Sequence, residues 1–243
     1  MRIGLFGGSF DPPHRGHIAL ARLAMERLGL DRVLLAPVGL QPLKRDRPQT
    51  SFEDRFAMTR RAIEGESGLE ISLVDAPRDD GRPNYTIDAV RALRKTLASG
   101  DELFCLMGAD SFLNIGKWYR AADLLVACDF AVASRPGFDL GRIAAALPPN
   151  ISVAACDGKH QDNLVLCLRG TEPRSSARRE SRLYLLPDLQ ELASATGIRA
   201  SLQHGAGPQM ELQPVVADYI REHGLYQESG ALEGRGRATP HPR

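Results

Sequence analysis

The stretch "GLFGGSFDPPHRGHIAL", residues 4–20, decides the fold. It leads from an apolar strand pattern, through two glycines and two prolines, into a segment whose apolar residues recur at helical spacing. Gly7 and Gly8 have no side chains, so a ligand can approach the backbone amides there closely. Pro12 and Pro13 stiffen the loop and delay the helix. In open parallel sheets ligands bind at the carboxyl ends of strands, which is where this loop begins.

The rest of the chain repeats the alternation of strand and helix. We predict an α/β fold: a Rossmann-like, doubly wound, mostly parallel sheet with helices on both faces. The predicted strands are residues 2–6, 32–38, 69–75, 102–108 and 129–134. The predicted helices are residues 17–30, 51–65, 86–99 and 121–128, and a last one that starts at Pro214 and ends before Gly224.

Length and composition predict one main domain. The chain has 243 residues and a hydrophobic content of 43%, which suffices for a sizeable core, and we assign residues 1–227 to this domain. Residues 157–182 are polar and carry five arginines, which predicts an Arg-rich, partly disordered loop insertion. Residues 228–243 are rich in Gly, Pro and Arg and predict a disordered tail.

Charge and cysteine usage exclude several classes of protein. The 31 Lys and Arg residues balance 30 Asp and Glu residues, so neither nucleic acid nor a membrane surface is an expected partner. No apolar run approaches the length of a signal peptide or a membrane span, which favours the cytoplasm. The four cysteines form no CxxC pair, so we expect reduced thiols and no cysteine zinc site. A homo-oligomer remains open.

The segment His14-Arg15-Gly16-His17 stands at the mouth of the first predicted helix. A helix N-terminus offers N–H groups and a partial positive charge, which favour phosphate. His14 and His17, at spacing i, i+3, can project to one side and donate to the same polyphosphate. The pattern is neither GxGxxG nor a P-loop. A metal pair and ordinary helix-start residues are the alternatives.

Further motifs follow the first loop along the chain. In order, and with that loop first, they are "GGSFDPPHRGH", "QPLKRD", "SFEDRFAM", "PNYTIDAV", "MGADSFLNIGKWYRAADLL", "ASRPGF", "SATGIR" and "VADYIREHGLY". With these motifs in this order, the chain resembles the HxGH nucleotidyltransferases and, more narrowly, the bacterial nicotinate-nucleotide adenylyltransferase family. The similarity extends from residue 2 to about residue 226.

The resemblance implies an enzyme of NAD biosynthesis. Its substrates would be ATP and nicotinate mononucleotide, and its products nicotinate adenine dinucleotide and pyrophosphate. Because no covalent enzyme intermediate is needed, the protein's task would be alignment and stabilisation of charge. Mg²⁺ would be bound through the ATP phosphates, so no metal site made of protein ligands is expected.

The resemblance also implies roles for individual residues. Three of them would be catalytic: His14, His17 and Arg199. The ATP site would comprise Gly7, Gly8, Ser9, Phe10, His14, His17, Gly108, Asp110, Ser194, Thr196, Ile198 and Arg199. The nicotinate mononucleotide site would comprise Lys44, Thr86, Trp118, Tyr119 and Arg135.

Without the resemblance, purely structural roles are alternatives for several of these positions. Asp110, Thr86 and the hydroxyls of the late motif could be helix caps. Trp118 could be packing, and Lys44 and Arg135 could be solvated charges.

Two positions depart from the family pattern. Leu43 stands where the family has a His before Lys44, and Ala195 stands where it has the second Ser of the late motif. These departures leave open a nucleotide-binding protein with impaired turnover. A second alternative is a pantetheine-phosphate adenylyltransferase, which shares HxGH and a similar late motif but whose chain is typically shorter.

Overall fold

The computed structural model describes residues 1–41, 50–134, 138, 141–154, 156, 164–171, 180–187, 189, 193–204 and 210–227. Its strands form one sheet with the order β3-β2-β1-β4-β5-β8-β7-β6. The strands are β1 (Arg2–Gly8), β2 (Arg32–Pro37), β3 (Leu69–Ile71), β4 (Glu102–Gly108), β5 (Asp129–Ala133), β6 (Ile151–Ala154), β7 (Leu164–Gly170) and β8 (Glu180–Leu186). Strands β1 to β5 and β8 run parallel, whereas β7 pairs antiparallel with both β6 and β8.

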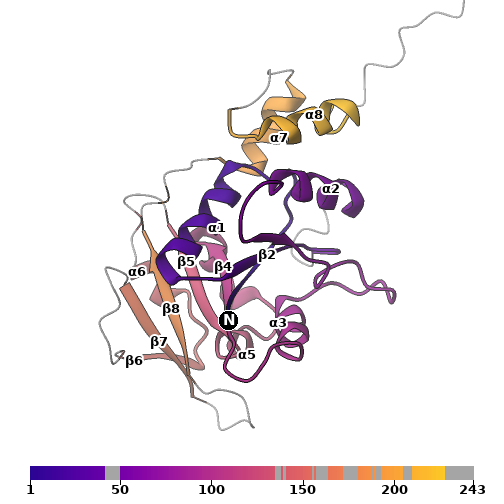
Figure 1. The fold of residues 1–243 in the computed structure, drawn as a ribbon. Coiled ribbons are helices and arrows are strands. Elements are labelled where there is room, and N and C mark those ends of the chain that lie inside the picture. The colour runs from indigo at the N-terminus through magenta and orange to yellow at the C-terminus, as the bar shows by residue number, and fades with distance from the viewer. Residues whose placement is uncertain are drawn as a thin grey trace, which may run out of the picture.

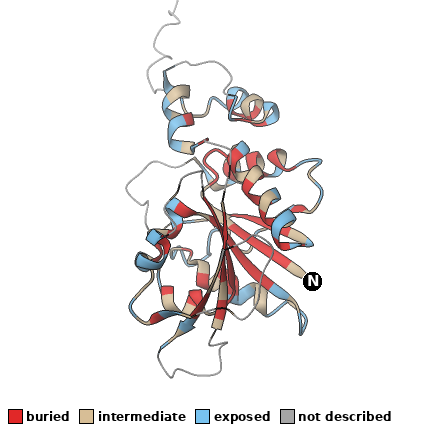
Figure 2. Cartoon of the chain, turned by 90° about the vertical axis from the view of Figure 1, so that its left-hand side faces the viewer, coloured by how far each residue is buried: buried red, intermediate tan, exposed pale blue. Residues whose placement is uncertain are grey.

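Helices cover both faces of the sheet (Figure 1), which confirms the predicted doubly wound α/β fold. The helices are α1 (Arg15–Leu28), α2 (Phe52–Ala62), α3 (Thr86–Arg94), α4 (Ala109–Phe112), the 3₁₀ turn η2 (Ile115–Lys117), α5 (Ala121–Leu125), α6 (Gly141–Ala145), α7 (Ala195–Gln203) and α8 (Pro214–Glu222). Helices α1, α2, α7 and α8 pack on one face, and α3 to α6 pack on the other. The strands are mostly buried between the two layers (Figure 2).

Local signals explain where the helices begin and end. The Ser51 hydroxyl accepts a hydrogen bond from the Asp54 amide, which caps α2 as the sequence predicts. Gly29 closes α1 with φ of 59°, a left-handed conformation that glycine adopts at little cost. Pro214 is the first residue of α8, where its missing N–H has no helical partner to lose.

The predicted loop over residues 157–182 is wrong for part of its length. Leu164–Gly170 forms strand β7, and β8 begins at Glu180. The segment is polar at both ends but contains a short apolar run between them. Cys167 and Leu168 of this run are buried in the sheet. Residues 157–163 and 172–179 lie outside the described residues.

The expectation of four reduced cysteines is also wrong, because Cys156 and Cys167 are joined by a disulfide. Residues 154 and 167 pair across β6 and β7, so the chain just beyond β6 passes close to Cys167. The Cα atoms of the two cysteines are 5.3 Å apart. The spacing of cysteines along the sequence does not reveal this antiparallel pairing. Cys105 and Cys128 are buried free thiols.

Several predicted elements are shorter than expected. Strand β3 ends at Ile71, because only Leu69–Ile71 pairs with β2. Helices α3 and α5 end at Arg94 and Leu125, a few residues before the predicted ends. Across the described ranges, none of the helices has the length and apolarity needed to span a membrane. The predicted tail, residues 228–243, lies outside the described residues.

Candidate active site

The candidate site lies at the carboxyl ends of β1 and β4. These neighbouring strands mark the point where the strand order reverses, because the chain builds outward from β1 to β3 and then returns to β4. Such a switch point leaves a crevice in which α/β proteins bind ligands. Two cavities open there, of about 520 and 280 Å³.

The larger cavity is lined by the ends of β1, β4 and β5 and by the starts of α1 and α7. It brings together most residues predicted for an ATP site: Gly7, Gly8, Ser9, Phe10, His14, His17, Gly108, Asp110, Ser194, Thr196 and Arg199. A Cβ atom added at Gly7 or Gly108 would meet nothing within 4 Å, so both strand ends leave open space.

Asp110 lies on the rim of this cavity and is not a helix cap. It is the second residue of α4, and Gly108 occupies the N-cap position. The alternative interpretation of Asp110 as a cap is therefore wrong.

The two histidines form one stacked unit. Their ring centroids are 3.7 Å apart with an interplanar angle of 28°. The backbone N–H of His14 donates to Nδ1 of His17 over 3.1 Å. Since Nδ1 accepts, the proton of the neutral His17 ring is on Nε2, and Nε2–H is the donor that this ring offers. Phe10 packs edge-on against His17 at 4.9 Å, which fixes the orientation of the ring.

The amides at the start of α1 are partly occupied within the protein. The amide of Arg15 donates to the Glu211 carbonyl over 2.8 Å, and that of His17 donates to the His14 carbonyl over 2.9 Å. Gly16 has a different task, since a Cβ there would lie 3.1 Å from the His14 ring. Its missing side chain lets the imidazole fold over the helix start.

Arg55 of α2 anchors the loop between β1 and α1. This guanidinium is only 2% exposed, and burial lowers its pKa, an effect partly offset by the negative charge of Asp11. It donates to the carbonyls of Ser9 at 2.8 Å, Gly39 at 3.3 Å and Thr50 at 3.0 Å. Arg55 therefore ties the loop to the segments that follow β2 and precede α2.

The start of helix α7 forms another wall of the larger cavity. Its N-cap is Ser194, whose hydroxyl accepts from the Gly197 amide over 3.1 Å. The Arg199 guanidinium donates to the Asp11 carbonyl over 2.6 Å and to the Thr196 hydroxyl over 3.4 Å. This arrangement brings a cation from α7 to the loop that precedes α1. Ile198, also assigned to the ATP site, is only 1% exposed and belongs to the core, so its side chain does not line the cavity.

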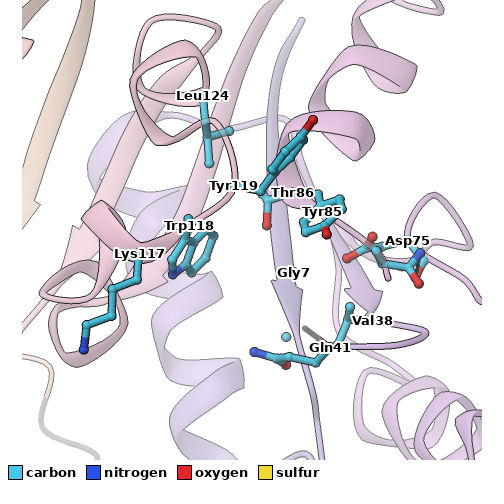
Figure 3. Close-up of a pocket in the computed structure, with 12 residues that line it drawn as sticks. Gly7, Val38, Gln41, Asp75, Tyr85, Thr86, Lys117, Trp118, Tyr119 and Leu124 are labelled. Atoms are coloured by element: carbon cyan, nitrogen blue, oxygen red, sulfur yellow. Dashed lines mark hydrogen bonds between the residues drawn. The ribbon is translucent and has the colours of Figure 1, made fainter. Parts of the chain in front are cut away.

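The smaller cavity contains the described part of the predicted nicotinate mononucleotide site. Figure 3 shows Tyr119 beside Tyr85 and Thr86, at the start of α3, and Trp118 on another side of the cavity. The rings of Tyr85 and Tyr119 are 4.3 Å apart. Tyr85 is the N-cap of α3 and Thr86 is its first residue, and both line the cavity.

Asp75 is a further carboxyl in the wall of the smaller cavity. It is 7% exposed, and burial raises its pKa to about 7, although the neighbouring Asn84 amide acts in the opposite direction. Asn84 fixes this wall through its hydrogen bonds with the carbonyls of Asp75 and Ala76 and with the Leu40 amide. The cavity therefore contains an acid that titrates near neutrality.

The two cavities share one border. Gly7 and Gly8 line both, together with Gln41, Thr86 and Trp118. The bare backbone at the end of β1 thus separates a cavity rich in histidine, hydroxyl and arginine groups from one rich in aromatic rings. The arrangement can hold two ligands end to end with their meeting point over Gly7.

Some candidate residues lie outside the described part of the chain: Lys44, Leu43 and Arg135. Among the residues that the structure does describe, no group of three or more His, Cys, Asp or Glu side chains is arranged to hold a metal ion. The site offers single polar side chains and the N-terminal ends of helices, which suit a ligand that is itself charged.

Sequence reasoning missed Arg55, Asp75 and Tyr226. Arg55 stands in a polar helix pattern that is typical of solvated charge, and nothing local marks it as buried. Tyr226 donates to the Asp11 carboxylate over 2.7 Å from the far end of the chain. Asp75 follows a strand, which is the one signal that could have suggested a place near the site.

Comparison with known proteins gives a family match over most of the chain. The model of the family described as cytidylyltransferase-like matches residues 5–200. A protein of Laribacter hongkongensis named "Probable nicotinate-nucleotide adenylyltransferase" is 40% identical, with 93% of this chain and 94% of that protein covered. A protein of the same name from Pseudomonas putida strain GB-1 is 33% identical, with 93% and 95% covered.

Solved structures support the fold. The nicotinic acid mononucleotide adenylyltransferase of Plasmodium falciparum, solved in complex with NaAD, superimposes with a TM-score of 0.63 at 18% identity. The alignment covers 93% of this chain and 97% of that one. At this identity, the likeness concerns the arrangement of strands and helices.

Proposed function

The chain belongs to the cytidylyltransferase-like family and, within it, to the nicotinate-nucleotide adenylyltransferases, and from this we propose that it joins ATP and nicotinate mononucleotide. The products are nicotinate adenine dinucleotide and pyrophosphate, in NAD biosynthesis. The observation that carries the proposal is the pair of cavities that meet at Gly7 and Gly8.

The larger cavity suits the triphosphate of ATP. His14 and His17 offer imidazole donors, and Arg199 offers a planar cation that matches phosphate geometry. A phosphate oxygen of the mononucleotide attacks the α-phosphorus of ATP. The bond from the α-phosphorus to the bridging oxygen breaks, and pyrophosphate leaves with the electron pair. The three side chains stabilise the charge that develops on the transferring and leaving groups.

A divalent cation, Mg²⁺, accompanies the triphosphate. Phosphate oxygens and water would supply most of its ligands, as is usual for Mg²⁺ bound with a nucleotide. When bound, it neutralises phosphate charge, and the protein's contribution is to orient that phosphate.

The smaller cavity suits the acceptor. Trp118 provides a flat surface for the pyridine ring, and the amide and hydroxyl of Thr86, at the start of α3, would provide donors for its carboxylate. Tyr119 and Thr86 border the same space, and we assign Lys44 and Arg135 to the acceptor's phosphate side. The border at Gly7 then brings the mononucleotide phosphate to the α-phosphate of ATP.

The decisive experiment measures pyrophosphate release from ATP and Mg²⁺ with three acceptors in parallel. These are nicotinate mononucleotide, nicotinamide mononucleotide and phosphopantetheine. We expect turnover with the first and a dinucleotide product. Turnover with phosphopantetheine alone would instead identify a pantetheine-phosphate adenylyltransferase. ATP binding without turnover for any acceptor would identify a nucleotide-binding protein. The substrates and balanced charge fit a cytoplasmic enzyme.

A further inference from the structure

The last described segment, residues 210–227, contacts the loop between β1 and α1 and the start of α1 at three points. The Arg15 amide donates to the Glu211 carbonyl over 2.8 Å, and Nε of Arg15 donates to the Leu212 carbonyl over 3.3 Å. The Tyr226 hydroxyl donates to Oδ1 of Asp11 over 2.7 Å, across 215 positions of sequence. Residues far along the chain therefore hold in place the loop between β1 and α1, which leads into the HxGH motif.

The bond between Tyr226 and Asp11 is partly shielded from water. Asp11 is 3% exposed, and burial together with the charge of Asp11 raises the pKa of the Tyr226 hydroxyl. The hydroxyl consequently stays protonated and acts as the donor. Hydrogen bonds to a carboxylate are stronger than those between neutral groups, and losing one leaves a buried oxygen with fewer donors.

The backbone that presents Tyr226 is in an uncommon conformation. Helix α8 ends at Glu222, and Gly224 and Tyr226 then adopt φ values of 59° and 63°. A tyrosine rarely enters this left-handed region unless its surroundings hold it there. The two left-handed residues turn the chain back from the helix, which allows the tyrosine ring to reach the loop.

Asp11 connects this contact to the groups that face the larger cavity. Its carbonyl accepts from Arg199 over 2.6 Å, and its side chain accepts from Tyr226. Phe10, the preceding residue, packs edge-on against His17. A displacement of Asp11 would therefore move both Arg199 and the histidine unit relative to a bound triphosphate.

We infer that Tyr226 is a positioning residue of the triphosphate site. Acting through Asp11, it fixes the loop that orients Arg199 and His17, although Tyr226 itself lines neither cavity. The identity of the ligand as ATP rests on the proposed function.

The test compares two tyrosine variants of the full chain. Tyr226→Phe removes the hydroxyl that meets Asp11. Tyr219→Phe is the matched control, since it removes a hydroxyl from α8 that donates to another carboxylate, Asp54, over 2.9 Å and away from the cavities. Calorimetric titration with ATP and Mg²⁺, without acceptor, gives the affinity of each variant, and thermal melts give its stability.

We expect Tyr226→Phe to weaken ATP binding about tenfold, while Tyr219→Phe stays close to the wild type in affinity. Both variants should lose a similar amount of thermal stability. Equal ATP affinities for the two variants would overturn the inference, because the tyrosine would then be merely structural.

A second variant keeps the test decisive if Tyr226→Phe does not fold. Asp11→Ala should give the same loss of ATP affinity. Where Tyr226→Phe folds, the double variant should be no worse than Asp11→Ala alone, because the two side chains act as one unit. Unchanged affinity in Asp11→Ala, or fully additive losses, would contradict the inference. A wild-type protein that binds ATP but forms no dinucleotide would refute only the proposed function. A wild type that does not bind ATP would refute both.

Discussion

The backbone N–H of His14 donates to Nδ1 of His17 over 3.1 Å, and the two imidazoles stack at 3.7 Å. This hydrogen bond assigns the donor role of His17 to Nε2, because Nδ1 is an acceptor. It also restricts the rotation of the ring, as does the contact with Phe10 at 4.9 Å. An imidazole held in this way can stabilise developing phosphate charge without first reorienting.

We predict that His17→Ala slows turnover much more than it weakens ATP binding. Removing one donor that stabilises developing charge typically lowers the rate by about 10²–10³. Steady-state kinetics and ATP titration measure the two effects separately. His204→Ala, at the C-terminal end of α7, is the control and should change neither. Equal losses of rate and affinity in His17→Ala would indicate ground-state binding alone.

Much of the fold and the phosphate loop could be predicted because their signals are local. The apolar run of β1, the glycines at its end and the helical spacing from Ile18 onward all lie within residues 2–28. Strand β7 could not be predicted because its short apolar run is flanked by polar segments. Its antiparallel partners, and with them the disulfide between Cys156 and Cys167, follow only from the sheet order.

The residues that hold the site in place could not be predicted, because they act through contacts between distant parts of the sequence. Arg55 is separated from the Ser9 carbonyl by 46 positions, and Tyr226 is separated from Asp11 by 215. Neither side chain differs in its sequence surroundings from an ordinary surface residue. The raised pKa of Asp75 likewise results from burial that the sequence does not show.

We predict that Asp75 makes the protein less stable as the pH rises from about 4 to about 7. Burial raises the pKa of the folded carboxyl to about 7, above its ordinary value of 3.8, so within this window the folded state holds the proton more tightly. The loss is complete above pH 7 and amounts to at most about 4 kcal/mol, at about 1.4 kcal/mol per pKa unit.

Denaturant unfolding of Asp75→Asn at several pH values measures this effect. The variant should gain stability over the wild type progressively between pH 4 and 7, and the difference should then level off. Asp80→Asn is the control, because Arg78 lowers the pKa of that exposed carboxyl to about 2, and no gain should appear. A difference independent of pH would contradict the assignment.

We predict that Ala195→Ser changes catalysis little. Ala195 is the first residue of α7 and lines the larger cavity, but the helix already has its cap in Ser194. A single added hydroxyl at such a position should shift kcat and the KM for ATP by no more than about twofold. A gain in kcat of several orders would show that the natural protein is impaired, and would favour the nucleotide-binding alternative.

We predict a strong preference for nicotinate over nicotinamide mononucleotide. The two acceptors differ in one ring substituent: the carboxylate only accepts hydrogen bonds, whereas the amide must also donate. Thr86, the first residue of α3, lines the smaller cavity, and if its amide and hydroxyl donate to the ring substituent, the amide's NH₂ would face donors. Mismatched polar groups in a closed site can discriminate by about 10⁴ in favourable cases.

Trp118→Ala separates this selectivity from affinity. The indole provides stacking area for either ring, so the variant should lower kcat/KM for both acceptors by a similar factor and leave their ratio unchanged. The measurement is kcat/KM for each acceptor in the wild type and in the variant, at saturating ATP. Comparable wild-type values for the two acceptors would instead indicate a dual-specificity enzyme, and a ratio that collapses in Trp118→Ala would assign the discrimination to the indole rather than to the start of α3.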